Sequence, residues 1–313
     1  MISVKSLRVD YEEVNAVNDL SFEVKEGQIY GLVGPNGAGK TSTIKALAGI
    51  IEPTYGEIFI NGIDMELSPQ KALRHIGFMP DFSPVYDNLK VWEYLDVFAA
   101  GYLIDSRERP GLIKYWADKV KLTEKYNTFV KELSRGMKQR LVLAKTLLPE
   151  PGILLLDEPS SGLDPVARKD MRDVLKEVAA TGKAVLISSH ILTELSEFCN
   201  AIGIMEKGRM VISGSISEIR NRLKSKGLLT IKLNEPSEDN INRIYGFLKS
   251  SELLSDLNKL SHSELQARFH SDSNDASWIL AQLVKQNIPV AEFFIKEDSV
   301  EDIFFKVGAH DIS

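Results

Sequence analysis

The stretch that most constrains the fold is residues 27–50, GQIYGLVGPNGAGKTSTIKALAGI. A short apolar run, IYGLV, leads into a glycine-rich turn and then into a helical pattern of apolar residues. The turn has the spacing of a P-loop, in which backbone N–H groups close around phosphate oxygens and the following helix adds its positive end. The predicted nucleotide-binding residues of this segment are Gly34, Pro35, Asn36, Gly37, Ala38, Gly39, Lys40, Thr41 and Ser42. In such a loop Lys40 reaches the β- and γ-phosphates, and the Thr41 hydroxyl is placed for Mg²⁺.

Two later apolar runs, GILLLDEPSSGLD and KAVLISSH, end in polar residues. Continuous apolar strands of this kind indicate a parallel sheet that is covered on both faces. The carboxyl ends of parallel strands meet at one edge, so Asp157, Glu158 and His190 are expected beside the P-loop. Asp157 suits the Mg²⁺ shell, and Glu158 can polarise an attacking water. His190 is placed to contact a γ-phosphate and that water, although a histidine after a strand is often structural.

A third stretch, ELSRGMKQRLVLAKTLL at residues 132–148, predicts a helix that buries Leu141–Leu148. Ser134 is a good N-cap for this helix. Its first turn nevertheless carries three cations at a helix end that is already positive, namely Arg135, Lys138 and Arg140. The stretch therefore predicts an anion at this helix start, although not every one of the three cations needs to touch it.

The chain has two predicted domains. Residues 1–215 hold the strand signals, with a mostly helical subdomain at about 86–150 inserted between strands. Composition changes near 215–226, where a charged amphipathic helix, SISEIRNRLKSKG, precedes a possible strand, LLTIKL. Residues 216–313, which include VEDIFFKV near the end, are expected to form a small α+β domain.

Composition excludes several classes of function. The formal net charge of −6 provides no global basic field for nucleic acid or for an anionic membrane. Cys199 is the single cysteine, so no internal disulfide can form, which fits a reducing cytoplasm. The first residues lack the apolar run of a secretory signal, and no stretch approaches the roughly 20 apolar residues of a membrane span. We therefore expect a cytoplasmic protein.

The motifs GPNGAGKT, LSRGM, ILLLDEP, SGLD and SSH occur in the order and approximate spacing of an ABC-type ATPase. Over about residues 1–215 the chain resembles the nucleotide-binding subunit of an ABC transporter. The stretch LSRGMKQRL and the C-terminal extension are most similar to the separately encoded ATPase subunits of ABC-2-type exporters. The resemblance implies a P-loop NTPase core, with ATP and Mg²⁺ as cofactors.

The resemblance also implies roles for individual residues. Tyr11 matches the aromatic residue that stacks on adenine, although it can also be read as an ordinary tyrosine at a strand end. Ser134 and Gly136 match the signature residues that touch the γ-phosphate of an ATP held by the other subunit. Asp164 matches the loop that crosses the dimer interface. Glu158 then becomes the general base and His190 the switch histidine.

Two departures from the family pattern stand out. After IGFMP the family usually has Gln, whereas this chain has Asp81. The Asp81 carboxylate could reach Mg²⁺ directly or through water, or it could be a solvated loop acid. The signature stretch also has Arg135 and Met137 where Gly and Gln are commonest, while Ser134 and Gly136 are retained.

These features predict an ATPase motor at the cytoplasmic face of the cell membrane. Two copies, or one copy and a close paralogue, would sandwich two ATP molecules and drive a separate permease, with export as the expected direction. The loop FSPVYDNL would contact the permease through Phe82 and Tyr86, unless these aromatics belong to the core. One alternative is a soluble ABC ATPase acting on ribosomes or DNA, which the single P-loop, the lack of a long coiled coil and the acidic charge disfavour. A non-hydrolysing regulatory module is the other, and the presence of both acids, Lys40 and His190 disfavours it.

Overall fold

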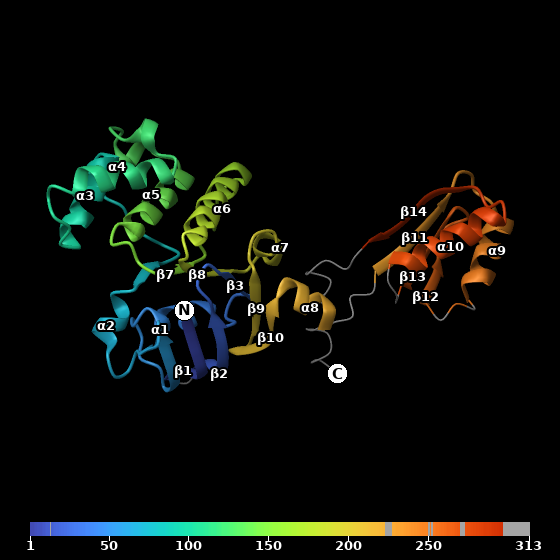
Figure 1. The fold of residues 1–313 in the computed structure, drawn as a ribbon, viewed down its shortest axis with the longest axis horizontal. Helices are drawn as coiled ribbons and strands as arrows, with labels where there is room; N and C mark the ends of the chain where they lie inside the picture. Colours follow the sequence, from blue (N-terminus) through green and yellow to red (C-terminus); the bar gives the residue numbers. More distant parts are fainter. Residues whose placement is uncertain (13, 223–226, 250, 252, 270–272, 297–313) are drawn as a thin grey trace. The chain divides into compact units, whose positions relative to one another are not determined.

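The structure is a computed structural model that describes residues 1–12, 14–222, 227–249, 251, 253–269 and 273–296. It divides into two compact units, Met1–Ile216 and Ser217–Ser313. Figure 1 shows the helices and strands with the labels used below.

A six-stranded sheet forms the centre of the first unit, in the order β10-β9-β3-β8-β7-β6. The five strands from β9 to β6 are parallel, and β10 runs antiparallel to β9. Every residue of β3, β7 and β8 is buried, as their continuous apolar runs predicted. The bounds of the strands are Ile29–Val33 for β3, Ile76–Met79 for β6, Ile153–Asp157 for β7, Ala184–Ser189 for β8, Ala201–Glu206 for β9 and Arg209–Ser215 for β10.

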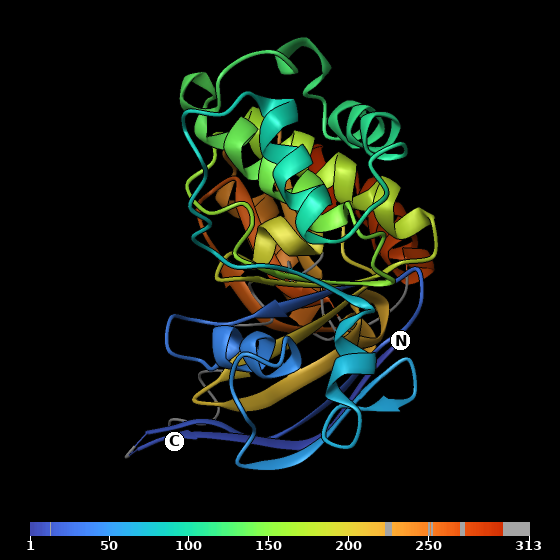
Figure 2. The ribbon, with the colours of Figure 1, turned by 90° about the vertical axis from the view of Figure 1, so that its left-hand side faces the viewer.

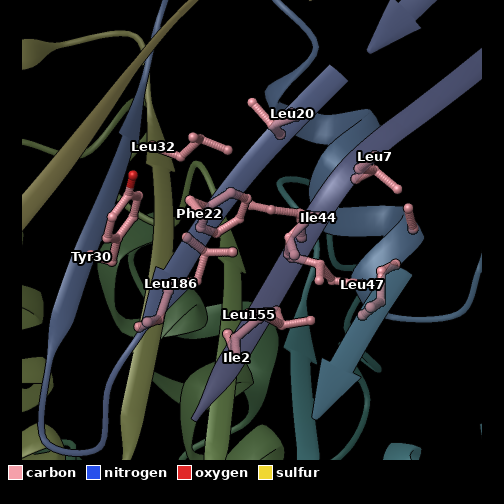
Figure 3. Packing of buried hydrophobic residues seen from close by; sticks show 14 of the residues in the cluster. Ile2, Leu7, Leu20, Phe22, Tyr30, Leu32, Ile44, Leu47, Leu155 and Leu186 are labelled. Carbon is pink, nitrogen blue, oxygen red and sulfur yellow. The ribbon is translucent and has the colours of Figure 1, made fainter. Parts of the chain in front are cut away.

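A second sheet, in the order β2-β1-β4-β5, is antiparallel. Its strands are β1 (Ile2–Tyr11), β2 (Val14–Val24), β4 (Tyr55–Ile60) and β5 (Ile63–Asp64). Helix α1 (Lys40–Leu47) packs between the two sheets and contributes Ile44 and Leu47 to their common core. Figure 3 shows this packing, in which the rings of Phe22 and Tyr30 stack with their centroids 5.3 Å apart. The P-loop helix is therefore held on both sides by apolar contacts.

The helical insert lies between β6 and β7, as expected from the pattern of residues 86–150. It consists of α3 (Val91–Gly101), α4 (Arg109–Lys119), η1 (Thr123–Lys125), η2 (Val130–Glu132) and α5 (Arg135–Leu147). Ser134 caps α5, since its Oγ accepts a hydrogen bond from the N–H of Met137 at 3.3 Å. The run from Leu141 to Ala144 and the pair Leu147 and Leu148 are buried, so the predicted helix is confirmed.

Three shorter connections complete the first unit. Helix α2 (Pro69–Leu73) precedes β6, α6 (Pro165–Ala180) follows β7, and α7 (Leu192–Ser196) follows β8. Figures 1 and 2 show α5 and α6 on one face of the six-stranded sheet and α1 with the antiparallel sheet on the other. The parallel strands are thus covered on both faces, as predicted.

The second unit is a small α+β fold. Helix α8 (Ile216–Arg222) leads to β11 (Gly227–Leu233), α9 (Glu238–Lys249), β12 (Leu254–Lys259), β13 (Glu264–Phe269), α10 (Ser273–Lys285) and β14 (Val290–Lys296). The antiparallel sheet has the order β12-β13-β11-β14, which together with the β-α-β-β-α-β succession is the ferredoxin-like arrangement. The strand predicted from LLTIKL is β11, whereas the segment VEDIFFKV lies outside the described residues.

Candidate functional site

The polar residues predicted to meet at one sheet edge do meet there. The P-loop follows β3, Asp157 ends β7 with Glu158 directly after it, and His190 follows β8. Because β8 lies between β3 and β7 in the sheet, these three carboxyl ends are neighbours. The site is therefore assembled by the parallel order of the strands.

Close backbone approach explains two of the P-loop glycines. A Cβ at Gly34 would collide with the carbonyl oxygen of Met205, and one at Gly39, where φ is +98°, with that of Ala16. Helix α1 begins directly after Gly39 without a side-chain cap and without an acidic residue in its first turn. Its first backbone N–H groups therefore remain available to an anion, which suits phosphate.

The side chain of Lys40 turns back into the P-loop that precedes it. Only 6% of its surface is exposed, and Nζ donates to the carbonyl oxygens of Gly34 at 2.7 Å and Pro35 at 3.2 Å. Burial lowers the pKa of Lys40, while the carboxylates of Glu158 and Asp157 oppose that shift. Nζ also lies 3.7 Å from Oε1 of Glu158. A buried ammonium in this position is suited to a phosphate oxygen.

Asp157 and Thr41 bring two hard oxygen donors together. Oγ1 of Thr41 donates to Oδ1 of Asp157 at 3.1 Å, and Asp157 is buried. Within the described residues no group of three or more His, Cys, Asp or Glu side chains could hold a metal ion. The donor set nevertheless fits Mg²⁺, which typically takes one or two protein oxygens together with phosphate oxygens and waters.

Glu158 and His190 form a hydrogen-bonded pair at the mouth of the site. Nδ1 of His190 donates to Oε2 of Glu158 at 2.9 Å, and the Glu158 side chain is 14% exposed. Glu158 also has a positive φ of +47°, a conformation that costs free energy in a residue other than glycine. The surrounding contacts hold this carboxylate in one place, where it borders both Lys40 and His190.

Ser188 is a site residue that the sequence reasoning missed. Its Oγ donates to Oδ1 of Asp157 at 2.6 Å and accepts the backbone N–H of Glu158 at 3.0 Å, so it connects both acids. It is fully buried and pairs with Asp157 in the β7–β8 register. A hydroxyl that interrupts a buried apolar strand, two residues before His190, was the signal that could have found it.

The remaining predicted residues lie apart from this cluster. Tyr11 ends β1 and is 43% exposed, and Asp81 is exposed just beyond β6. Ser134 caps α5, whereas Asp164 caps α6 by accepting the N–H groups of Val166 and Ala167. In the described part of the chain, no hydrogen bond or ion pair joins Tyr11, Asp81, Ser134, Gly136 or Asp164 to the cluster of Lys40, Asp157 and Glu158.

Two of the three cations in the first two turns of α5 have carboxylate partners within the chain. Nζ of Lys138 donates to Asp87 at 2.8 Å. Arg140 is buried, donates to the carbonyl oxygens of Val120 and Lys121, and lies 3.5 Å from Asp170. The expected external anion is thus not needed to explain Lys138 and Arg140.

Comparison with known proteins identifies the family of the chain. Residues 17–161 match the family model described as ABC transporter. The chain is 31% identical over 312 residues to the uncharacterized ABC transporter ATP-binding protein YhcH of Bacillus subtilis (strain 168). The matched region covers 98% of this chain and 95% of that relative. It is 37% identical over 214 residues to the Nod factor export ATP-binding protein I of Burkholderia orbicola (strain AU 1054), covering 68% of this chain and 70% of the relative.

A solved structure of an ATP-binding subunit of an ABC transporter superposes with a TM-score of 0.63 at 31% identity, over 71% of this chain and 93% of that one. Fold and site define a P-loop ATPase. The chain belongs to the ABC transporter family, as one of its ATP-binding subunits, which confirms the resemblance seen in the sequence. None of the helices in the described part of the chain is long and apolar enough to cross a membrane.

Proposed function

We propose that this ATPase is the motor subunit of a membrane exporter, at the cytoplasmic face of the cell membrane. Two copies, or one copy and a close paralogue, close around two ATP molecules and drive a separately encoded permease. The observation that carries the hydrolytic part of this proposal is the hydrogen-bonded pair of Glu158 and His190 beside the buried Lys40, because it provides a base next to an ammonium suited to phosphate.

In the proposed reaction the P-loop and Lys40 hold the β- and γ-phosphates. Thr41 and Asp157 provide the protein oxygens for Mg²⁺, which when bound offsets phosphate charge. Both side chains are already oriented toward each other, 3.1 Å apart. Ser42 and Tyr11 complete the nucleotide site, the latter by stacking on adenine from the end of β1.

Glu158 acts as the general base that orients and deprotonates the attacking water. His190 fixes the orientation of the Glu158 carboxylate through Nδ1 and contacts the γ-phosphate. Ser188 holds the backbone of Glu158 and the side chain of Asp157 at once, so the base and the Mg²⁺ ligand keep their relative position. Asp81 is an accessory oxygen donor toward Mg²⁺.

The second half of each site comes from the partner subunit. Ser134 and Gly136 lie at the start of α5, in the helical insert, and no hydrogen bond or ion pair joins them to Lys40 within the described chain. A helix start favours an anion, and we assign it the γ-phosphate of the ATP that the partner holds. Asp164 lies in the loop that would cross the interface.

The permease contact is proposed at two features of the first unit. Phe82 and Tyr86 are 81% and 57% exposed, so they are not core residues. A cavity of about 700 Å³ lies between the end of α1, β4 and α2, and its lining includes the glutamates Glu52, Glu57 and Glu66. Lys5 also lines this cavity and pairs with Glu57 at 3.3 Å, which leaves Glu52 and Glu66 to complement the Lys and Arg in which cytoplasmic loops of membrane proteins are enriched.

Export as the direction of transport is supported by the 37% identical relative whose name describes Nod factor export. The test is co-purification from detergent-solubilised membranes under ATP, with Glu158→Gln to slow hydrolysis. We expect a polytopic membrane protein to co-elute and charge reversal at Glu52 and Glu66 to weaken its recovery. Full ATPase activity in solution without any membrane partner, or salt-sensitive binding to RNA or DNA, would contradict the transporter proposal.

A further inference from the structure

Arg135 differs from the other two cations at the start of α5. Lys138 and Arg140 have carboxylate partners, Asp87 and Asp170. Arg135 is exposed, and its side chain makes no hydrogen bond or ion pair with any residue that the structure describes. Its position is nevertheless defined by a different kind of contact.

The guanidinium of Arg135 lies directly against the backbone of Gly162. A Cβ at Gly162 would lie only 2.5 Å from Cζ and 2.7 Å from Nη2 of Arg135, and Gly162 has a φ of +66°. The left-handed backbone at Gly162 favours glycine, whereas the exposed end of the Arg135 side chain could turn aside for a Cβ. The first residue of α5 thus rests on the loop that joins β7 to α6.

A second contact joins the same two segments. Gly136 is buried, and a Cβ there would lie 2.6 Å from Cβ of Ala167, in the first turn of α6. The first turn of α5 is therefore seated on the loop 158–164 at Gly162 and on α6 at Ala167. Because Gly136 leaves no free space against Ala167, a shift of the first turn of α5 is expected to move the start of α6 and, with it, the loop that precedes α6.

The other end of that loop is Glu158. The N–H of Ser161 donates to the carbonyl oxygen of Glu158 at 3.0 Å, and the N–H of Leu163 donates to the carbonyl oxygen of Ser160 at 3.2 Å. These turns make the segment from Glu158 to Leu163 compact. Glu158 itself has the strained φ of +47°, which persists only while its surroundings impose it. Movement at Gly162 is therefore expected to reach the base.

We propose that Arg135 is a positioning residue for Glu158 of its own subunit, acting through Gly162. The inference rests on the proposed function, in which Ser134 and Gly136 touch the phosphate held by the partner. Capture of that phosphate fixes the first turn of α5, and Arg135 passes the constraint to the loop 158–164. Each chain thereby adjusts its own base according to whether the partner's site is filled.

Mixed dimers with a single base per dimer test this assignment. Two differently tagged chains are combined, isolated by tandem affinity purification with ATP and Mg²⁺, and assayed for single-turnover hydrolysis. In the split arrangement one chain carries Glu158→Gln and the other Arg135→Ala, so the remaining base and the changed arginine share a chain. In the joined arrangement one chain carries both changes and its partner carries none.

We expect the split dimer to hydrolyse ATP about tenfold more slowly than a reference dimer of one wild-type and one Glu158→Gln chain. A factor of this size is typical of coupling between two sites. The joined dimer should match that reference, and so should a split dimer with Lys138→Ala in place of Arg135→Ala. The reverse pattern, with only the joined dimer slowed, would mean that Arg135 touches the partner's phosphate and would overturn the proposal. Equal rates in both arrangements would overturn it too.

Two further variants separate positioning from charge. Arg135→Lys keeps the charge but lacks the planar group that lies on Gly162, so it should not restore the rate. Gly162→Ala should lower kcat with little change in KM, and should have a much smaller effect in a chain that already carries Arg135→Ala. Restoration by Arg135→Lys, or additive effects in the double variant, would contradict the assignment.

The proposed function can fail separately from this inference. If Glu158→Gln chains form no ATP-dependent dimer in size-exclusion chromatography, the proposed shared sites are wrong, and the inference falls with them. If the dimer forms and the split and joined arrangements behave alike, the proposed function stands and only the role of Arg135 is rejected.

Discussion

His190 and Glu158 are 32 residues apart in sequence, yet Nδ1 of the histidine donates to Oε2 of the glutamate at 2.9 Å. The two residues end neighbouring parallel strands, β8 and β7, so their side chains converge at the same edge. This pair, with Lys40 at 3.7 Å from the other Glu158 oxygen, is the centre of the proposed hydrolytic site.

Replacing His190 with Ala should lower kcat by about 100-fold and leave KM for ATP nearly unchanged, because the base loses its orienting partner. Steady-state ATPase assays measure both constants. Adding His190→Ala to Glu158→Gln should cost little more than Glu158→Gln alone, since the two side chains act as a unit. Fully additive losses would show that the two residues act independently.

Ser188→Ala should affect both folding and the dependence on Mg²⁺. Removal of the hydroxyl leaves a buried carboxylate oxygen and a backbone N–H with fewer partners, which costs about 1–3 kcal/mol of unfolding free energy. We also expect a higher Mg²⁺ concentration for half-maximal turnover, because Asp157 is less well oriented.

Ser189→Ala is the matched control for Ser188. Its hydroxyl accepts the N–H of Ile191 and makes no hydrogen bond to either acid among the described residues. Chemical denaturation should show a loss of stability in this variant, whereas its Mg²⁺ dependence should stay at the wild-type value. An equal Mg²⁺ shift in both variants would assign the effect to general destabilisation.

Asp81→Gln should retain or raise ATPase activity. Glutamine is the usual residue of the family at this position, is one methylene longer, and removes a negative charge from the edge that is proposed to bind phosphate. Turnover is measured across a range of Mg²⁺ concentrations, with Glu108→Gln in the helical insert as the control for net charge. Loss of Mg²⁺-dependent turnover in Asp81→Gln would count against an accessory role and would make Asp81 an essential ligand.

Ser134→Arg should leave ATP binding by the monomer unchanged but abolish ATP-driven dimerisation and turnover, because the added bulk lies at the proposed interface. Ser134→Ala removes the hydroxyl that caps α5 and should cost about 1 kcal/mol of stability. Nucleotide binding is followed by fluorescence of an ATP analogue, and dimerisation by size-exclusion chromatography. Normal ATP-driven dimerisation of the Ser134→Arg variant would contradict the proposal that the two subunits share each site.

Cys199 provides a reporter of nucleotide binding. Burial raises the pKa of its thiol above the usual value, so thiolate is scarce in the native state. At pH 8 a disulfide reagent should react slowly with the folded protein and rapidly in denaturant. If reaction requires global unfolding, ATP and Mg²⁺ at 100 times Kd should slow it by about 100-fold. Fast labelling of the native protein would show that this thiol is accessible.

Part of this organisation could be predicted because it is local in the chain. The P-loop combines a strand, a turn and a helix within residues 27–50, and the cap at Ser134 involves a partner three residues away. The buried strands could be predicted equally well, since a parallel strand covered on both faces requires a continuous apolar run. Asp157, Glu158 and His190 could then be placed on one edge from strand direction alone.

The sequence by itself therefore determined the class of fold, the family and the sheet edge at which Asp157, Glu158 and His190 meet. Only the tertiary structure decided that Ser188 connects the two acids, that Arg140 is buried beside Asp170 and that Arg135 rests on Gly162. It also decided the strand order of the second unit. These relationships depend on strand register and on the packing of segments far apart in the chain. No local propensity or spacing specifies such contacts, because each side chain alone is compatible with many partners.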